Sequence, residues 1–155
     1  MHFERTRDTY VVSTAPELLD IDAVHAYLVR SYWAEGIPKS VVERSIQGSL
    51  CFGLHKRLAP SGSAQVGFAR VVSDRATFAY LCDVYVLEAE RGRGLGKWLI
   101  ETLLAHPELQ NLRRFMLGTR DAHGLYAPRG FTPLARPHTF MEIARPGLYT
   151  QPAVG

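Results

Sequence analysis

The chain has 155 residues, of which 46% are hydrophobic and 21% charged, a composition typical of one soluble domain with a full core. Its formal net charge of +3 suits an anionic ligand but is too small an excess to indicate nucleic-acid binding. No apolar run approaches the ~20 residues of a membrane-spanning helix, and residues 1–5 lack the apolar core of a signal peptide. We therefore expect a cytoplasmic protein with no nucleic-acid or membrane partner.

The first half of the chain predicts two helices followed by three strands. After a first strand at residues 9–14, Asp20 is placed to cap a helix whose apolar stripe continues to Tyr32 and which ends at Gly36. A second, shorter helix is expected between Pro38 and Gly48. Tight turns then separate three strands, which we expect at residues 50–55, 66–72 and 78–87.

The second half predicts helices that alternate with strands. A helix runs to about Ala105, and after it we expect a strand at 112–118, a short helix at 121–127 and two final strands, Phe131–Leu134 and Thr139–Ile143. This order favours a single α/β domain at residues 1–145, in which an antiparallel meander leads into a parallel crossover. A tail rich in Pro and Gly follows at residues 146–155.

Cysteine and histidine give no sign of a metal site. Cys51 and Cys82 are the only cysteines, and each lies in an apolar run typical of a strand. Free thiols are therefore expected rather than a disulfide or a metal ligand pair. The six histidines show no spacing typical of paired ligands, so no metal is predicted.

The most informative stretch is residues 83–100, where an apolar strand passes through a glycine-rich turn into an apolar helix. Bare backbone N–H groups at the start of a helix form an anion site, because they have no partner within the helix. Three cations add positive charge, so a phosphate-bearing ligand is predicted. The residues of this turn are Arg91, Gly92, Arg93, Gly94, Leu95, Gly96 and Lys97.

Two common phosphate motifs do not fit this turn. A Walker loop requires Gly where the chain has Arg91, and Ser or Thr where it has Trp98. In the dinucleotide pattern G-x-G-x-x-G, the third glycine would fall on Lys97. Taken alone, the turn could also serve only to pack a helix on a sheet.

Two further patterns point to one family. The spacing Arg-x-x-Gly-x-Gly at residues 91–96 resembles the pyrophosphate motif of the GNAT superfamily of acyl-CoA-dependent N-acetyltransferases. Residues 122–131 are similar to the Ala-x-x-Leu-Tyr-x-x-x-Gly-Phe signature that follows the next strand in that family. The resemblance extends from about Tyr32 to Ile143 and is closest in style to a branch with unassigned substrates. It implies the GNAT fold, with a mixed central sheet of about six to seven strands flanked by about four helices.

The resemblance implies acetyl-CoA as co-substrate. In the family the glycine turn binds the pyrophosphate, and the backbone equivalent to Val84, Tyr85 and Val86 pairs with the pantetheine arm. A main-chain N–H in that stretch would also polarise the thioester carbonyl. Thr119 stands where many members have an Asn that holds the arm, so this cofactor contact is expected to be weaker or different.

The resemblance also suggests catalytic residues. Tyr126 is the predicted general acid, because the family places this tyrosine beside the sulfur; alternatively, its ring only packs under the cofactor arm. Asp83 is the candidate general base, although nearby arginines could equally hold its carboxylate. His25, His55, His123 or a chain of water molecules are the other bases that the sequence leaves open.

The predicted acceptor site includes Tyr32, Trp33 and Glu35, where the first two helices meet. The aromatic pair could line an amine pocket and Glu35 could attract a cation, although core packing explains the two aromatic residues equally well. The predicted function is transfer of an acetyl group from acetyl-CoA to a primary amine of a small molecule or peptide, by direct attack in a ternary complex. A non-catalytic module that binds acyl-CoA or a metabolite is the alternative. Since dimers are frequent in the family, a homodimer is left open.

Overall fold

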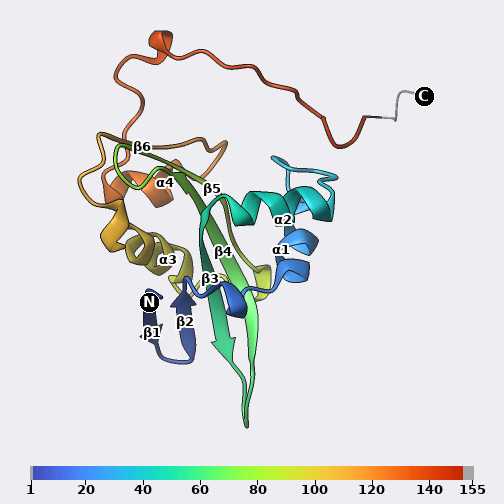
Figure 1. Cartoon of the computed structure of the whole chain (residues 1–155). Coiled ribbons are helices and arrows are strands. Elements are labelled where there is room, and N and C mark those ends of the chain that lie inside the picture. Colours follow the sequence, from blue (N-terminus) through green and yellow to red (C-terminus); the bar gives the residue numbers. More distant parts are fainter. Residues whose placement is uncertain (1, 152–155) are drawn as a thin grey trace.

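A mixed six-stranded sheet forms the centre of the computed structural model, which describes residues 2–151 (Figure 1). The strands follow one another in chain order across the sheet, each antiparallel to the last, except that β5 and β6 are parallel. Their bounds are β1 Glu4–Arg7, β2 Tyr10–Ser13, β3 Leu50–Arg57, β4 Ser63–Ser73, β5 Phe78–Val86 and β6 Arg114–Leu117. The predicted α/β class with a mixed sheet is confirmed.

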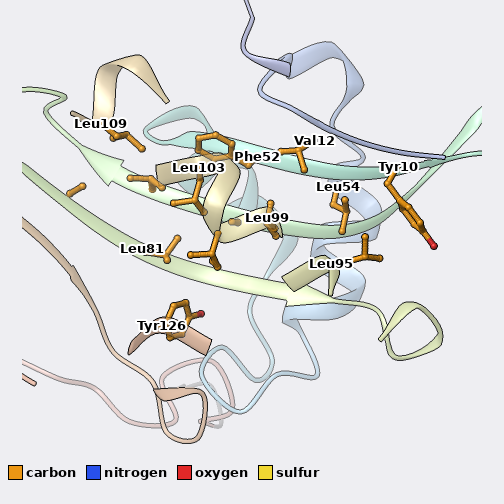
Figure 2. Close-up of a cluster of buried hydrophobic side chains, with 14 of the residues drawn as sticks. Tyr10, Val12, Phe52, Leu54, Leu81, Leu95, Leu99, Leu103, Leu109 and Tyr126 are labelled. Carbon is orange, nitrogen blue, oxygen red and sulfur yellow. The ribbon is translucent and has the colours of Figure 1, made fainter. Parts of the chain in front are cut away.

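Four α-helices flank the sheet. Their bounds are α1 Ile21–Leu28, α2 Lys39–Gln47, α3 Leu95–Leu104 and α4 His123–Tyr126. The helix α3 packs on one face of the sheet, where Leu99 and Leu103 meet Phe52 and Leu81 in the main core, and Tyr126 of α4 joins this cluster (Figure 2). Helices α1 and α2 cover part of the other face, over Phe68 and Tyr85.

The start of α1 agrees with the prediction, and its end does not. The Asp20 carboxylate accepts a hydrogen bond from the Ala23 N–H at 3.0 Å and so caps the helix. The helix ends at Leu28 and not near Gly36. The Ser31 hydroxyl donates to the Leu28 carbonyl at 2.7 Å and accepts from the Ala34 N–H at 3.1 Å, which stabilises a turn in place of further helix.

The strand β1 was not predicted. Its sequence Glu-Arg-Thr-Arg is polar throughout and all four residues are exposed, so no apolar pattern marks it. It exists because it pairs with β2 in a hairpin, with Glu4 opposite Ser13 and Arg7 opposite Tyr10.

The two strands predicted at Phe131–Leu134 and Thr139–Ile143 are wrong. Neither segment pairs with a strand, and Thr139 closes a short 3-10 turn that begins at Pro137. Pro133 interrupts the first segment and has no N–H to donate to a ladder. Residues 132–151 instead form an extended C-terminal arm, which Figure 1 shows in orange and red, leaving the body near β6 and α4 and crossing toward α1 and α2.

Among residues 2–151, no helix has both the length and the apolar character needed to span a membrane.

Candidate active site

A cavity of about 420 Å³ opens where β5 and β6 separate. The two strands pair only from Phe78–Leu81 to Arg114–Leu117, whereas β5 continues to Val86. Beyond Leu81, the edge of β5 that faces away from β4 therefore has no strand beside it. The cavity is lined by residues 80–84 of β5, by residues 117–122 at the end of β6 and beyond it, by Tyr126 and by Tyr32 and Trp33.

A β-bulge lies where this open edge begins. Arg70 of β4 is opposite Cys82, and Phe68 is opposite Tyr85, so two residues of β5 face a single residue of β4. The two are Asp83 and Val84, and Asp83 has a φ of 54°, in the left-handed region. A bulge bends its strand and leaves one residue unpaired, so backbone groups here are free to bind an extended ligand.

The glycine turn follows at the end of β5. Gly92 and Gly94 have φ values of 84° and 74°, which residues with side chains rarely adopt. The helix α3 begins at Leu95 without a side-chain cap, so its first N–H groups are available to an anion. The side chain of Leu95 is buried in the core and the residues of the turn before it are exposed, which is the geometry that an anion site requires; phosphate binding itself stays a prediction.

The cations of the turn are not equally free. Lys97 and Arg93 are exposed, and the Arg93 guanidinium lies 3.7 Å from Glu90. Arg91 is turned back toward β5, where it donates to the Val86 carbonyl at 3.1 Å and to the Tyr27 hydroxyl at 3.0 Å. Arg91 therefore fixes the turn against β5 and occupies one carbonyl of the stretch predicted to hold the pantetheine arm.

Side chains that were not among the predicted site residues hold the glycine turn in place through hydrogen bonds. The Glu90 carboxylate is buried, and it accepts hydrogen bonds from the Tyr10 hydroxyl and from Lys56. These two bonds, led by that of Tyr10, lower the pKa of Glu90. Arg7 of β1 donates to the Arg93 carbonyl at 3.2 Å and adds a cation beside Gly94. In the sequence, the acidic residue just before the turn was the only sign of these contacts.

Tyr126 lies at the wall of the cavity on α4. It is only 8% exposed, and burial raises its pKa to about 12, so the phenol is protonated at neutral pH. No residue among 2–151 accepts a hydrogen bond from its hydroxyl. The Tyr126 ring packs edge-on against Phe131, with 5.9 Å between the ring centres, and this contact fixes the orientation of the Tyr126 ring.

Asp83 also lines the cavity, but both of its oxygens are engaged. One accepts from Trp33 Nε1 at 2.8 Å and the other from Arg70 Nε at 2.8 Å. The contact with Arg70 is what the alternative prediction describes, in which an arginine holds the Asp83 carboxylate. The predicted role of Asp83 as a general base stays a prediction.

The two predicted aromatic residues of the acceptor site line the cavity. Tyr32 and Trp33 meet edge-to-face at 5.0 Å, and both side chains are more than two-fifths exposed. The Arg120 guanidinium lies 3.8 Å from the centre of the Tyr32 ring, and the backbone N–H of Arg120 donates to the Tyr32 hydroxyl. Glu35 is exposed and is not among the lining residues.

Thr119 lines the cavity, at the position where many of the sequences that this chain resembles have an Asn that holds the cofactor arm. Its hydroxyl accepts a hydrogen bond from the Ala122 N–H at 3.0 Å, which stabilises the entry into α4. A contact of this hydroxyl with a cofactor would compete with that bond, so Thr119 remains a predicted contact only.

The other candidate bases lie outside the cavity lining. His25 bonds the Ile37 carbonyl through Nε2 at 2.9 Å, and His55 is buried under Gly53, where burial lowers its pKa. His123 begins α4 and is exposed. The described residues include no group of three or more His, Cys, Asp or Glu side chains that could hold a metal ion, and both cysteines are free.

Sequence comparison finds a matching family and a curated relative of this chain. A family model described as the acetyltransferase (GNAT) family matches residues 21–131. A curated protein of Gibberella zeae, named a putative acetyltransferase, is 35% identical over 139 residues, which cover 78% of this chain and 77% of that protein.

Structural comparison finds the same architecture. The crystal structure of a putative acetyltransferase of the GNAT family from Xanthomonas campestris is 52% identical, with a TM-score of 0.85, and the match covers 92% of this chain and 97% of that one. A predicted acetyltransferase from Clostridium acetobutylicum, whose structure contains acetyl-CoA, is 15% identical with a TM-score of 0.60. That match covers 93% and 96% of the two chains and shows likeness of fold alone.

Proposed function

The chain belongs to the acetyltransferase (GNAT) family, and we propose that it transfers an acetyl group from acetyl-CoA to a primary amine of a small molecule or peptide. One observation carries the proposal. The unpaired edge of β5 leads directly into the glycine turn, so a single extended ligand can lie along the strand and place a phosphate at the start of α3.

We assign the parts of acetyl-CoA to the site as follows. The pyrophosphate would lie at residues 91–97, with main-chain N–H groups as donors and Arg7 as an additional cation. The pantetheine arm would follow the backbone of Val84, Tyr85 and Val86 as an added strand. The thioester would then lie in the cavity near Tyr126, the residue to which the family resemblance assigns the role of general acid.

The reaction needs no covalent enzyme intermediate. The lone pair of the amine nitrogen attacks the thioester carbon, and the C–N bond forms while the carbonyl oxygen becomes an oxyanion. A main-chain N–H at the Asp83–Val84 bulge would donate to that oxyanion, a contact worth ~3 kcal/mol in typical oxyanion sites. The C–S bond then breaks, and the phenol of Tyr126 protonates the departing thiolate.

The nitrogen must also lose a proton. Because Trp33 and Arg70 occupy both oxygens of Asp83, we assign proton removal to water in the exposed part of the cavity. Asp83 then positions Trp33 at the wall of the acceptor pocket. The base role that was predicted for Asp83 is the competing assignment, and the pH–rate profile of the variant Asp83→Asn separates the two.

The proposal is tested by ligand-dependent thermal shift and by turnover. A ligand at a hundred times its dissociation constant adds ~2.7 kcal/mol to folded-state stability, a rise of roughly 5–10 °C for a domain of this size. We expect that rise with acetyl-CoA and CoA, and none with ATP or NAD. Thiol release with a panel of primary amines should then identify acceptors. Binding of acetyl-CoA without turnover on any amine would favour the non-catalytic alternative.

A further inference from the structure

The indole of Trp33 is held in place by a largely buried ion pair, although it lies at the wall of the cavity. Trp33 Nε1 donates to one Asp83 oxygen at 2.8 Å, and the other oxygen accepts from Arg70 Nε at 2.8 Å. The Asp83 and Arg70 side chains are largely buried, whereas Trp33 is 41% exposed. Binding costs less entropy when the protein side chain that receives the ligand is already fixed. Trp33 is therefore a preorganised surface for a ligand that enters the cavity.

Two more aromatic side chains line the same cavity. Tyr32 meets Trp33 edge-to-face, with 5.0 Å between the ring centres, and Tyr80 lies on β5. Tyr32 is 48% exposed and Tyr80 is 38% exposed, so the rest of the protein covers none of the three rings completely. Exposed aromatic side chains that gather at one cavity are typical of a site for an apolar or aromatic group of a ligand. We call Tyr32, Trp33 and Tyr80 the aromatic wall.

The charges that line the cavity are balanced. Asp83 is paired with Arg70, and the Asp121 carboxylate lies 3.8 Å from the Arg120 guanidinium. Among the described residues, no other acidic side chain lines the cavity, and Glu35, which was expected to attract a cation, is not part of the lining. An acceptor with a second ammonium group would therefore lose hydration without gaining an unpaired carboxylate. This balance disfavours a polyamine.

We infer that the acceptor is an arylalkylamine, a monoamine whose aromatic ring packs on Trp33 and whose nitrogen reaches the thioester through a short alkyl chain. The inference rests on the proposed function and narrows its class of acceptor. Tyr126 and the aromatic wall line one cavity of about 420 Å³, a volume that suits a small molecule. The ring of the acceptor would displace water from the wall, which favours such an amine over an aliphatic one.

The transfer to such an amine is balanced without a further reactant. The amine nitrogen forms a C–N bond with the acetyl carbon, and the C–S bond of acetyl-CoA breaks. The proton that leaves the nitrogen goes to water, Tyr126 protonates the departing thiolate, and the phenol recovers a proton from water. The products are the N-acetylated arylalkylamine and CoA.

Thiol-release kinetics at saturating acetyl-CoA test the inference with three amines. The amines are 2-phenylethylamine, n-butylamine, which has no ring, and spermidine, which carries additional ammonium groups. We expect kcat/KM for 2-phenylethylamine to exceed that for each of the other two by at least about tenfold, because only this amine packs a ring on the wall.

The variant Trp33→Leu tests which side chain carries the preference. It removes the indole, so the ratio of kcat/KM between 2-phenylethylamine and n-butylamine should fall to within about threefold of one. Phe140→Leu is the matched control, because Phe140 is an exposed aromatic side chain outside the cavity lining. It should keep the wild-type ratio. Far-UV circular dichroism and the melting temperature check that each variant folds.

The outcomes separate this inference from the proposed function. Equal or better turnover of n-butylamine or spermidine by the wild type would keep the acetyltransferase and overturn the arylalkylamine. An unchanged ratio in folded Trp33→Leu would overturn it as well. If no amine is acetylated, the proposed function fails, and isothermal titration calorimetry with CoA present decides whether the aromatic wall selects its ligand. There, 2-phenylethylamine should bind at least about tenfold more tightly than n-butylamine, and equal or undetectable binding of the two would overturn the inference.

Discussion

Asp83 and Arg70 form an ion pair across the bulge between β5 and β4, with 2.8 Å between Arg70 Nε and a carboxylate oxygen. The two side chains are only 10% and 18% exposed. Removing one partner of such a pair leaves the other charge buried and uncompensated. The pair therefore stabilises the bulge from which an oxyanion donor is proposed to act.

The variant Asp83→Asn tests what this carboxylate does. It keeps a hydrogen-bond acceptor for Trp33 but leaves the Arg70 charge unpaired, so we expect unfolding free energy to fall by about 3 kcal/mol in urea titrations. Asp22→Asn, in the exposed pair with Lys39, should leave unfolding unchanged. If water is the base, the acidic limb of the pH–rate profile persists in Asp83→Asn. Loss of that limb would instead assign the base to Asp83.

The variant Tyr126→Phe tests the general acid. The ring fills the same space, so the affinity for acetyl-CoA should stay within about twofold, whereas kcat should fall by about 100-fold. Since burial raises the pKa of Tyr126 to about 12, the phenol stays protonated through the neutral range and should produce no basic limb there. Tyr80→Phe, which removes the hydroxyl of another tyrosine that lines the cavity, is the control. A Tyr126→Phe enzyme with normal kcat would leave the ring with a packing role only.

The short-range features of this site could be predicted from sequence. The strand at Val84–Val86, the glycine turn and the segment around Tyr126 each depend on residues that are neighbours in the chain, so their spacing carries the information. The start of α1 is of the same kind, because Asp20 caps a helix only three residues away.

Long-range contacts could not be predicted. Tyr10 and Glu90 are 80 residues apart, and Arg7 and Arg93 are 86 apart, so nothing local shows that they meet. The prediction of a strand in the C-terminal arm was wrong for a related reason. Thr139–Ile143 has a strand-like composition, but a strand needs a neighbour, and the chain places this segment beside none.

Glu90 gives a prediction about cofactor affinity. The variant Glu90→Gln weakens the hydrogen bonds that hold the turn to Tyr10 and Lys56, so the KM for acetyl-CoA should rise about tenfold while kcat changes little. Steady-state kinetics with acetyl-CoA varied at saturating amine measures both. Glu101→Gln, which loses an ion pair with Arg129 farther along α3, is the control and should leave the KM unchanged.

The same glutamate makes stability depend on pH. Its pKa is lower in the folded than in the unfolded protein, so its contribution is present above the unfolded value of about 4.5 and is lost as pH falls through the folded value. The difference in melting temperature between wild type and Glu90→Gln should therefore be full at pH 7 and shrink as the pH falls below about 4.5. A difference that stays constant down to pH 2 would show that the charge of Glu90 has no part in it.

The phosphate turn gives the last prediction, in which strain and binding can be separated. Gly94 has a φ of 74°, and a Val side chain there would both strain the backbone and block approach to the N–H groups at the start of α3. Gly62, in the β3–β4 turn, has a φ of 92° and open space around it. Both Gly94→Val and Gly62→Val should therefore lose stability, but only Gly94→Val should lose acetyl-CoA binding in isothermal titration calorimetry. Retained tight binding in Gly94→Val would place the pyrophosphate away from the turn, and loss of binding in Gly62→Val would mean that strain alone explains both results.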